Sequence, residues 1–400
     1  MQLQHGIHLG YCTNIHRGES WEETWQALKQ HTLRVKAEVA PDQPYGIGLR
    51  LSARAAAELA QSGQLLAFQR WLEQSGCYVF TINGFPYGSF HGTRVKEQVF
   101  LPDWSSPQRL EYTNLLFDLL AQLLPAGISG SVSTLPGSHK TFALGTEQLE
   151  AIFANVRACR EHIEKRSLQS NRELHLGFEP EPLGLFETSG ETLKFFAHYL
   201  DRHPTDFGGL RFIGVNYDTC HLALQYEDAA HALNRLHEAG IRISKLHFSN
   251  ALSLQPTEAM IARLKAFDEP VYFHQVVASW GEQQPLRRFK DLPDALAQAE
   301  QRPQPSLGQE WRVHFHIPLH APPAEGFGNT QDHLLGTMDW LAQHPQACQH
   351  LEMETYTWEV LPTAMRSGDV VDQLLREYRW TLDELASRGL SLNSAPPGTL

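Results

Sequence analysis

Strand-like and helix-like segments alternate along most of this chain of 400 residues. The strand-like segments are apolar with a period of two, and the segments between them place apolar residues three and four positions apart. Such alternation is typical of parallel α/β sheets, and seven or eight units favour a closed (β/α)₈ TIM barrel over an open sheet. The expected strands are residues 5–12, 45–51, 77–84, 128–135, 174–179, 210–218, 241–249, 311–320 and 350–358.

This pattern contains one strand more than a barrel needs. Residues 271–278 also look like a strand but fall outside the alternating order, and residues 279–309 are polar and rich in proline. We therefore expect an insertion near residues 251–309, with 271–278 and one of the last two strands in a peripheral hairpin. Residues 1–390 are expected to form a single TIM-barrel domain, followed by a flexible tail at 391–400.

Composition excludes several classes of protein. The net charge of −12 does not provide the basic surface that nucleic acids require. The five cysteines are scattered and form no CxxC pair, which indicates reduced thiols in a cytoplasmic protein. The sequence shows no signal peptide and no apolar run near the roughly 20 residues that span a bilayer, so we expect no membrane span.

The segment 174–188, LHLGFEPEPLGLFET, begins as an apolar strand and ends in carboxylates. Glu179 and Glu181 are two positions apart, so on an extended strand both would project from the same face. Pro180 and Pro182 remove backbone donors, as suits a strand that leaves its sheet. A carboxylate pair at the end of a buried strand is costly unless a cation or a substrate hydroxyl compensates it, so this segment is a candidate site.

Four later strands also end in side chains that can bind a metal. They carry Asp218 and His221, His247 and Asn250, His314 and His316, and Glu352 and Glu354. Because a barrel gathers the carboxyl ends of its strands at one rim, these groups are expected to converge there. Mixed oxygen and imidazole donors suit a divalent ion such as Mn²⁺, Zn²⁺, Fe²⁺ or Co²⁺, and the absence of cysteine from the set argues against a structural zinc site.

Each of these side chains also has a structural explanation. A lone histidine after a strand usually forms hydrogen bonds in the core or a loop, and a lone glutamate at a strand end often caps a helix or pairs with arginine. Asp218 could cap a short helix that runs through Thr219 to His221. Chance is a reasonable explanation at one strand end but a poor one at five in succession, which favours a metal site.

Several segments resemble the xylose isomerase-like superfamily of TIM barrels, which includes sugar isomerases, ketose 3-epimerases and endonuclease IV. The similar segments are EPLGLFET (181–188), YDTCHLA (217–223) and METY (353–356), while HFH (314–316) lies where the endonucleases have an Asp-x-His metal motif. This resemblance implies a metal held by Glu181, Asp218, His247 and Glu354. It favours Glu181 over Glu179 and Glu354 over Glu352, and it makes Glu187 a candidate substrate contact.

A narrower resemblance covers nearly the whole chain. The segments HLGYCTNIHRGESWEETWQAL, FHGTRVKEQVFLPDW, GFEPEP, YDTCHLA, WRVHFH and LEMETYTWEVLP together look like the EboE proteins, called metabolite traffic or sugar isomerase-like proteins. That family belongs to bacterial gene clusters implicated in moving or processing a secondary-metabolite precursor. The resemblance therefore implies a small-molecule substrate and partners encoded in the same cluster.

The expected activity is that of a metal-dependent sugar isomerase or epimerase. It would act on a small polyol, ketose or secondary-metabolite precursor by proton transfer through an enediolate. Glu181 and Glu354 would transfer the protons, and His221 and His316 would polarise an oxygen or relay protons. Further substrate contacts are expected from Glu179, Glu187, His314, Asn250 and Asn83.

Two other classes of function remain open. The first is a barrel that binds and carries a metabolite without transforming it, and the second is a metal-dependent hydrolase similar to endonuclease IV. A phosphate-bearing substrate is a further alternative, because Arg94, Lys96 and Lys140 lie in or near loops at the expected mouth. Solvated surface charges are the more general explanation for these three residues.

Overall fold

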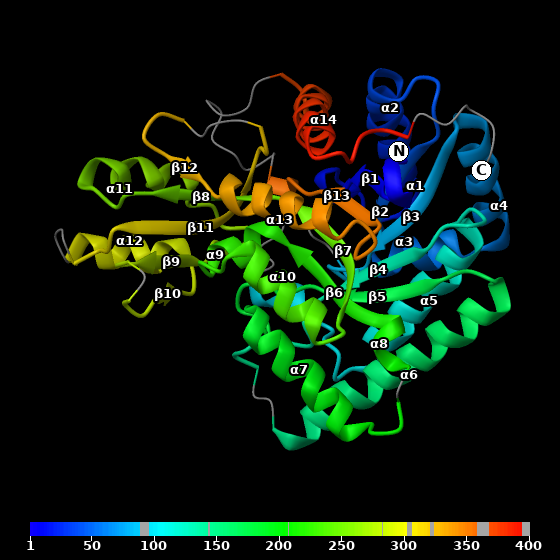
Figure 1. Ribbon diagram of the computed structural model, residues 1–400, viewed down its shortest axis with the longest axis horizontal. Helices are drawn as coiled ribbons and strands as arrows, with labels where there is room; N and C mark the ends of the chain where they lie inside the picture. Colours follow the sequence, from blue (N-terminus) through cyan, green and yellow to red (C-terminus); the bar gives the residue numbers. More distant parts are fainter. Residues whose placement is uncertain are drawn as a thin grey trace.

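Eight parallel strands form a nearly closed barrel in the computed structural model of the chain (Figure 1). They follow the order β1-β13-β7-β6-β5-β4-β3-β2, and a backbone bridge between Cys12 and Gly48 brings β1 next to β2. This confirms the predicted TIM barrel. The strands are β1 (His8–Tyr11), β2 (Tyr45–Arg50), β3 (Cys77–Asn83), β4 (Gly130–Thr134), β5 (Leu174–Phe178), β6 (Ile213–Asp218), β7 (Arg242–Phe248) and β13 (His350–Met353).

The structure describes residues 1–88, 96–142, 145–206, 208–281, 283–301, 306–320, 324–357 and 368–393. Arg94 and the last seven residues of the expected tail lie outside these ranges. Leu392, in the described part of that tail, forms a backbone bridge with Leu3. Among the described residues, no helix has the length and apolar character needed to cross a bilayer.

Helices between consecutive strands cover the outside of the barrel (Figure 1). Local signals fix their starts: α1 begins at Trp21 because Ser20 and Glu23 form reciprocal capping hydrogen bonds. The same arrangement of Thr188 and Glu191 starts α7. The helices are α1 (Trp21–Ala27), α2 (Leu33–Val39), α3 (Ala53–Leu59), α4 (Ser62–Ser75), α5 (Pro107–Leu123), α6 (Thr146–Ser170), α7 (Ser189–Arg202), α8 (Gly209–Phe212), α9 (Thr219–Leu224), α10 (Ala229–Glu238), α13 (Gln331–Gln343) and α14 (Val370–Ser387).

The expected insertion is present and forms a second, antiparallel sheet beside the barrel (Figure 1). Its five strands follow the order β10-β9-β11-β8-β12. The insertion reaches Asn329, and so extends past residue 309, where the sequence pattern ended it. Its elements are β8 (Asn250–Leu254), α11 (Glu258–Leu264), β9 (Val276–Ser279), β10 (Arg287–Phe289), α12 (Leu292–Gln301), β11 (Glu310–Ile317) and β12 (Gly328–Asn329).

The strand predicted at 311–320, one of the two left open for the peripheral hairpin, does not belong to the barrel. It forms β11, which pairs antiparallel with β8 and with β9. Of the two candidates for the peripheral pairing, 311–320 and 350–358, the structure therefore selects the first. A parallel neighbour for β7 requires a crossover, usually through a helix. β13 follows α13 and fills the position between β7 and β1. β11 also follows a helix, α12, but it pairs antiparallel within the insertion.

A buried charged network crosses the interior of the barrel. Glu352 on β13 accepts hydrogen bonds from Lys245 Nζ at 2.6 Å and from His247 Nε2 at 2.7 Å. Lys245 also donates to Ser133 Oγ on β4 at 3.0 Å. Gly48 leaves room for the carboxylate, because a Cβ at this position would lie 1.8 Å from Glu352 Oε1. The network thus links three strands and depends on a missing side chain from a fourth.

Replacing Gly48 with alanine is expected to lower the free energy of unfolding by about 1–3 kcal/mol, because the methyl group overpacks the interior against Glu352. Urea unfolding followed by circular dichroism would measure the change. Gly63→Ala is the matched control, since no heavy atom lies within 4 Å of its Cβ position on α4. An unchanged unfolding midpoint for Gly48→Ala would show that Glu352 does not need this space.

Candidate metal centre

Four buried side chains converge at the carboxyl ends of neighbouring barrel strands. We call Glu179, Asp218, His247 and Glu354 the carboxylate cluster; each offers one ligand atom, and these atoms all lie within 4.8 Å of one another. His247 Nδ1 lies 3.2 Å from Glu179 Oε1, 3.6 Å from Asp218 Oδ2 and 3.1 Å from Glu354 Oε2. Three carboxylates therefore surround one imidazole nitrogen.

Asp218 shows most directly that the cluster suits a cation. Its Oδ1 accepts hydrogen bonds from Ser249 Oγ at 2.6 Å and from the His221 backbone N–H at 3.1 Å. The second of these bonds caps α9, so Asp218 has the helix-capping role that was predicted as its structural explanation. Its Oδ2, which faces His247, is buried and has no hydrogen-bond partner. An unpartnered buried carboxylate oxygen is costly unless a cation lies beside it.

The orientation of His247 leaves Nδ1 available to the cluster. Its Nε2–H donates to Glu352, the carboxylate that also pairs with Lys245. Ligating histidines typically donate their second ring nitrogen in this way, which fixes the ring and its tautomer. Burial alone would lower the pKa of His247, but the carboxylates of Glu354 and Glu179 raise it well above the usual value. In the metal-free protein, a proton on Nδ1 partly offsets the negative charge.

Glu354 joins the cluster to the first strand of the barrel. Its Oε1 accepts a hydrogen bond at 2.7 Å from Asn14 Nδ2, from the turn that follows β1. Burial, together with the carboxylates of Glu179 and Asp218, raises the pKa of Glu354 to about 7 against the opposing effect of His247. This carboxyl group therefore gains and loses a proton near neutral pH.

The donor set fits a divalent first-row ion. One imidazole nitrogen and three carboxylates supply the mixed nitrogen and oxygen ligands that Mn²⁺, Fe²⁺, Co²⁺ and Zn²⁺ accept. With His247 neutral and able to ligate, three ionised carboxylates would give the buried cluster a net negative charge, most of which a divalent cation would offset. Asp218 Oδ2, which forms no hydrogen bond, is also consistent with a bound divalent ion.

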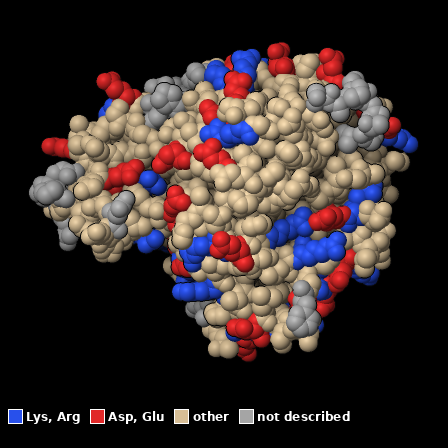
Figure 2. All heavy atoms as spheres, in the orientation of Figure 1, with Lys and Arg blue, Asp and Glu red and all other residues tan. Residues whose placement is uncertain are grey.

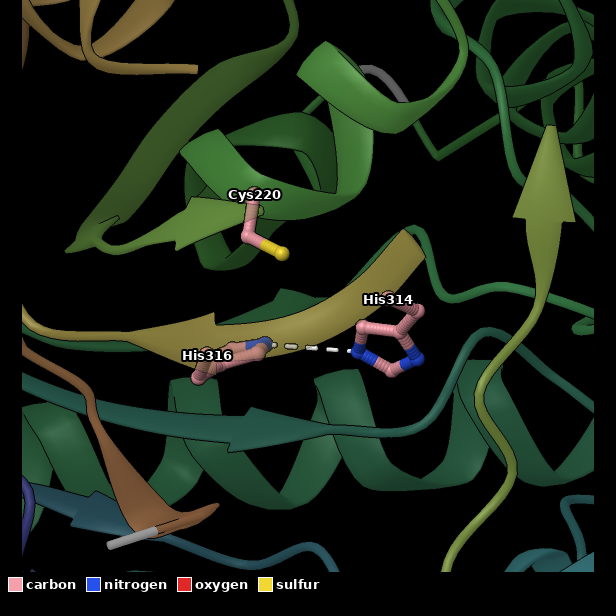
Figure 3. A group of neighbouring side chains, drawn as sticks. All are labelled: Cys220, His314 and His316. Atoms are coloured by element: carbon pink, nitrogen blue, oxygen red, sulfur yellow. Dashed lines mark hydrogen bonds between the residues drawn. The ribbon is translucent and has the colours of Figure 1, made fainter. Parts of the chain in front are cut away.

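A second group of potential ligands lies beside the first. We call His221, His314 and His316 the histidine cluster; His316 Nε2 lies 3.3 Å from the Nε2 atoms of both other rings. Figure 3 shows the rings of His314 and His316 facing each other on β11, with Cys220 on α9 opposite them. A tetrahedral ion with ligand distances of about 2.0–2.1 Å would have nitrogen separations of this size.

The outer nitrogens of two of these rings are already engaged. His221 Nδ1 donates to the carbonyl of Pro180 at 2.9 Å, and His316 Nδ1 to the carbonyl of Glu354 at 3.1 Å. Two neutral rings would therefore bring Nε2 lone pairs together, and a proton or another cation must lie between them. Burial tends to lower the pKa of His221, but the carboxylates of Asp218 and Glu181 raise it to about 9. Burial lowers the pKa of His316 to about 4.

A cavity of about 610 Å³, counting the space open to solvent, adjoins both clusters. Its polar end is formed by the side chains of Asn14, Asn83, Glu179, Glu181, His221, His314 and Glu354. The cavity therefore brings a bound molecule to the carboxyl ends of several barrel strands and to the insertion at the same time. This is the arrangement expected of a small-molecule site in a TIM barrel.

The structure separates Glu179 from Glu181, the two carboxylates at the end of β5. The Glu179 backbone N–H bonds to the Thr134 carbonyl at 2.9 Å, so Glu179 continues the barrel edge and reaches the carboxylate cluster. Glu181 belongs to the following turn, where its N–H bonds to the Phe186 carbonyl. The resemblance assigns Glu181 to the metal, but the structure groups it with His221 and His314, 3.5 Å from His221 Nδ1.

The predicted substrate contacts lie in different places. Asn83 and His314 line the cavity. Glu187 is buried in a network with Lys140, Gln225 and Gln275, and Asn250 donates to the Leu319 carbonyl at 3.2 Å; neither lines the cavity. Both side chains follow polar strand ends in the sequence, but their hydrogen bonds turn them toward the packing between barrel and insertion.

The lysines predicted as phosphate contacts have carboxylate partners. Lys96 lines the cavity and pairs with Asp291, while Lys140 pairs with Glu187 and Glu191. A phosphate would have to compete with these carboxylates for either ammonium group. The geometry therefore gives little support to a phosphate-bearing substrate.

Sequence reasoning did not identify which side chains hold the ligands in place. Asn14 holds Glu354, and Lys245 and Glu352 hold His247. The Glu352–Glu354 spacing was a usable signal, because two carboxylates on one strand face can serve as ligand and as support for a ligand. No local signal pairs Asn14 with Glu354, since 340 positions separate them.

Comparisons with known proteins support the fold. No family model and no curated protein matches the chain in sequence. In structure it is similar to a D-tagatose 3-epimerase-like protein, with 10% identity, 96% of this chain and 98% of that chain covered, and a TM-score of 0.51. The chain has a TIM-barrel fold similar to the fold of that protein.

Two further solved structures match with lower TM-scores. The IolI protein, solved with a zinc atom, has 10% identity over 96% of this chain and 99% of that chain, with a TM-score of 0.48. A xylose isomerase domain containing protein from Salmonella typhimurium has 11% identity over 96% of this chain and 99% of that chain, with a TM-score of 0.42.

Glu179→Gln is expected to weaken Mn²⁺ binding at least about tenfold, because it removes a charged oxygen from the carboxylate cluster. Glu181→Gln should leave this affinity nearly unchanged. Titration of metal-free protein in competition with a chelating dye would measure both. A larger loss for Glu181→Gln would instead support the ligand that the family resemblance implies.

Metal affinity is expected to rise with pH between about pH 6 and pH 8, because Glu354, with a pKa of about 7, and His247 must release protons to bind a cation. The same titration repeated across this range would show the dependence. Glu354→Gln should bind more weakly and with a shallower dependence on pH. Affinity that is flat across the range would contradict the raised pKa of Glu354.

Proposed function

We propose that this protein is a metal-dependent isomerase or epimerase that moves a proton between carbons of a small polyol, ketose or related metabolite precursor. The observation that carries the proposal is the carboxylate cluster, in which the buried Asp218 Oδ2 forms no hydrogen bond, next to a cavity at the barrel mouth. The resemblance to EboE and sugar isomerase-like proteins agrees with this class of substrate.

A divalent cation would be held by Glu179, Asp218, His247 and Glu354. When bound, it would lower the pKa of adjacent substrate oxygens and stabilise the charge of an enediolate. Asn14 would keep Glu354 in place through its 2.7 Å hydrogen bond, and Glu352 would keep Nδ1 of His247 turned toward the ion. Both hydrogen bonds hold the ligands in position before the substrate binds, which reduces the conformational entropy lost on binding.

Glu181 and Glu354 are the two groups suited to proton transfer. Both line the cavity, and Glu181 lies outside the carboxylate cluster. Burial and the carboxylates of Glu179 and Asp218 raise the pKa of Glu181 well above its usual value, against the effect of His221. One carboxylate would remove the proton from the carbon that bears the hydroxyl, and the other, protonated, would return one to the neighbouring carbon.

The histidine cluster would bind the substrate oxygens on the insertion side. His221 and His314 both line the cavity, and His316 lies behind them at 3.3 Å from each. With His221 protonated, its Nε2–H can point either to His316 or to an oxygen in the cavity. This ring would therefore polarise a carbonyl group, whereas His316 would act through it.

Surface charge argues against the hydrolase alternative. On the face shown in Figure 2, lysine and arginine side chains are interspersed with aspartate and glutamate, and the net charge of the chain is −12. Lys96, at the cavity, is already paired with Asp291. A nucleic-acid backbone would find little of the basic surface that it requires.

Solvent isotope exchange tests the proposal. Mn²⁺-loaded protein would be incubated in D₂O with dihydroxyacetone, D-fructose and 2-hydroxyacetophenone, and deuterium at carbon would be followed by NMR. We expect exchange with at least one compound, and a loss of about 10²–10⁴-fold in Glu181→Gln with metal content retained. Glu161→Gln, on the exposed face of α6, is the matched control.

Metal binding with ligand affinity but no exchange would overturn the enzymatic proposal and favour the carriage of a metabolite. Absence of stoichiometric metal from protein purified without chelators, together with no uptake on titration, would overturn the metal centre itself.

A further inference from the structure

The cavity beside the carboxylate cluster has an apolar side as well as a polar end. Besides the carboxylates, six apolar or aromatic side chains line it, namely Phe85, Val99, Phe100, Tyr272, Phe273 and Tyr356. They come from the loop after β3, the turn at Lys96–Phe100, the insertion, and the segment after β13. Four segments of the chain thus build one apolar wall.

Part of this wall is distinct from the main hydrophobic core. Tyr272 forms a small cluster with Val99, Val271 and Tyr356, and the ring centroids of the two tyrosines lie 5.4 Å apart in an edge-to-face arrangement. Tyr272 is 6% exposed, whereas Val99, Phe273 and Tyr356 are only partly buried. Partly exposed aromatic side chains around a cavity leave apolar surface that a bound ligand can cover.

The wall carries no uncompensated positive charge among the described residues. Lys96 lines the cavity there, and its ammonium group pairs with Asp291 and lies 5.2 Å from the centre of the Phe273 ring. Lys290 Nζ lies 4.9 Å from the same ring centre and 3.8 Å from Glu97 Oε2. Glu179, Glu181 and Glu354, which also line the cavity, would repel an anion in the absence of metal. A ligand that fills the cavity is therefore neutral on the side away from the metal.

A free sugar does not match this surface. Its hydroxyl groups surround the whole molecule, so those facing Phe100, Tyr272 and Phe273 would lose hydrogen bonds to water without gaining others. A molecule with two unlike ends would satisfy both halves of the cavity. Its adjacent oxygens would face the carboxylate cluster, and an aromatic ring would lie against the wall in edge or offset contact.

We infer that the substrate joins a vicinal diol or hydroxy-ketone head to a neutral aromatic group, which packs between Phe100, Tyr272, Phe273 and Tyr356. This inference rests on the proposed function, because the head is recognised by the metal centre. It narrows the substrate class from sugars in general to polyols or hydroxy-ketones that carry an aromatic substituent.

Matched diols test the inference on metal-loaded protein. Calorimetric titration would compare 1-phenylethane-1,2-diol with propane-1,2-diol, which share the head and differ only in a phenyl or methyl group. We expect the phenyl compound to bind at least about tenfold more tightly, because its ring is removed from water against the wall. Glycerol 3-phosphate is the third probe, and it should bind more weakly than the phenyl compound.

The variant Phe273→Ala should reduce the preference for the phenyl diol and leave the affinity for propane-1,2-diol nearly unchanged. Phe273 is partly exposed, so the variant is expected to fold. Leu168→Ala, at a side chain on α6 that is 78% exposed, is the matched control for loss of an apolar group. Val99→Ser provides a second, independent change in the same wall.

The outcomes separate this inference from the proposed function. Equal affinity for the two diols, or tighter binding of glycerol 3-phosphate, would overturn the aromatic substrate while the metal centre stands. Failure of both diols to bind the metal-loaded protein would overturn the proposed recognition of a diol by the metal, and the inference with it.

Discussion

The site depends on one electrostatic constraint, the burial of three carboxylates around a single imidazole nitrogen. Such an arrangement is unfavourable in a medium of low polarity unless positive charge compensates it. Glu179, Asp218 and Glu354 come from three different strands, so the barrel itself forces them together. The protonated His247 offsets part of this charge in the metal-free protein, and a divalent ion would offset more of it. Stability and metal affinity are therefore expected to be coupled through the same four side chains.

The surrounding structure holds this cluster from two sides. From the interior of the barrel, Lys245 and Glu352 fix His247, and Gly48 provides the space that the Glu352 side chain occupies. From the outside, the insertion supplies His314 and His316, and His316 Nε2 lies 3.3 Å from the Nε2 atoms of both His314 and His221. The first support is part of the barrel, whereas the second comes from a sheet that the barrel does not require for closure.

Much of the fold follows from the sequence because the periods of strands and helices are local properties. The strand ends also indicated Asp218, His247 and Glu354, which the structure brings together. The strand at 310–317 could not be assigned in this way, because its alternation is the same whether its partners are parallel or antiparallel. Only the pairing with β8 and β9 shows that it belongs to the insertion.

The choice between Glu179 and Glu181 shows a second limit. Both stand in a Glu-Pro pair, and the longer sequence motif favours the second of them. The hydrogen bond from the Glu179 N–H to Thr134, which keeps only Glu179 on the barrel edge, involves a residue 45 positions earlier. Contacts of this kind depend on the closed barrel and leave no trace in a short motif.

The attachment of the insertion has a consequence for how the site could diversify. The extra sheet leaves the barrel directly after β7 and returns through α13, so its length and surface can change while the strands that carry the carboxylate cluster keep their register. Tyr272, Phe273 and His314 lie within it and line the cavity beside the carboxylate cluster. One chemical centre could thus be retained in related chains while exchange of a single contiguous segment selects a different molecule.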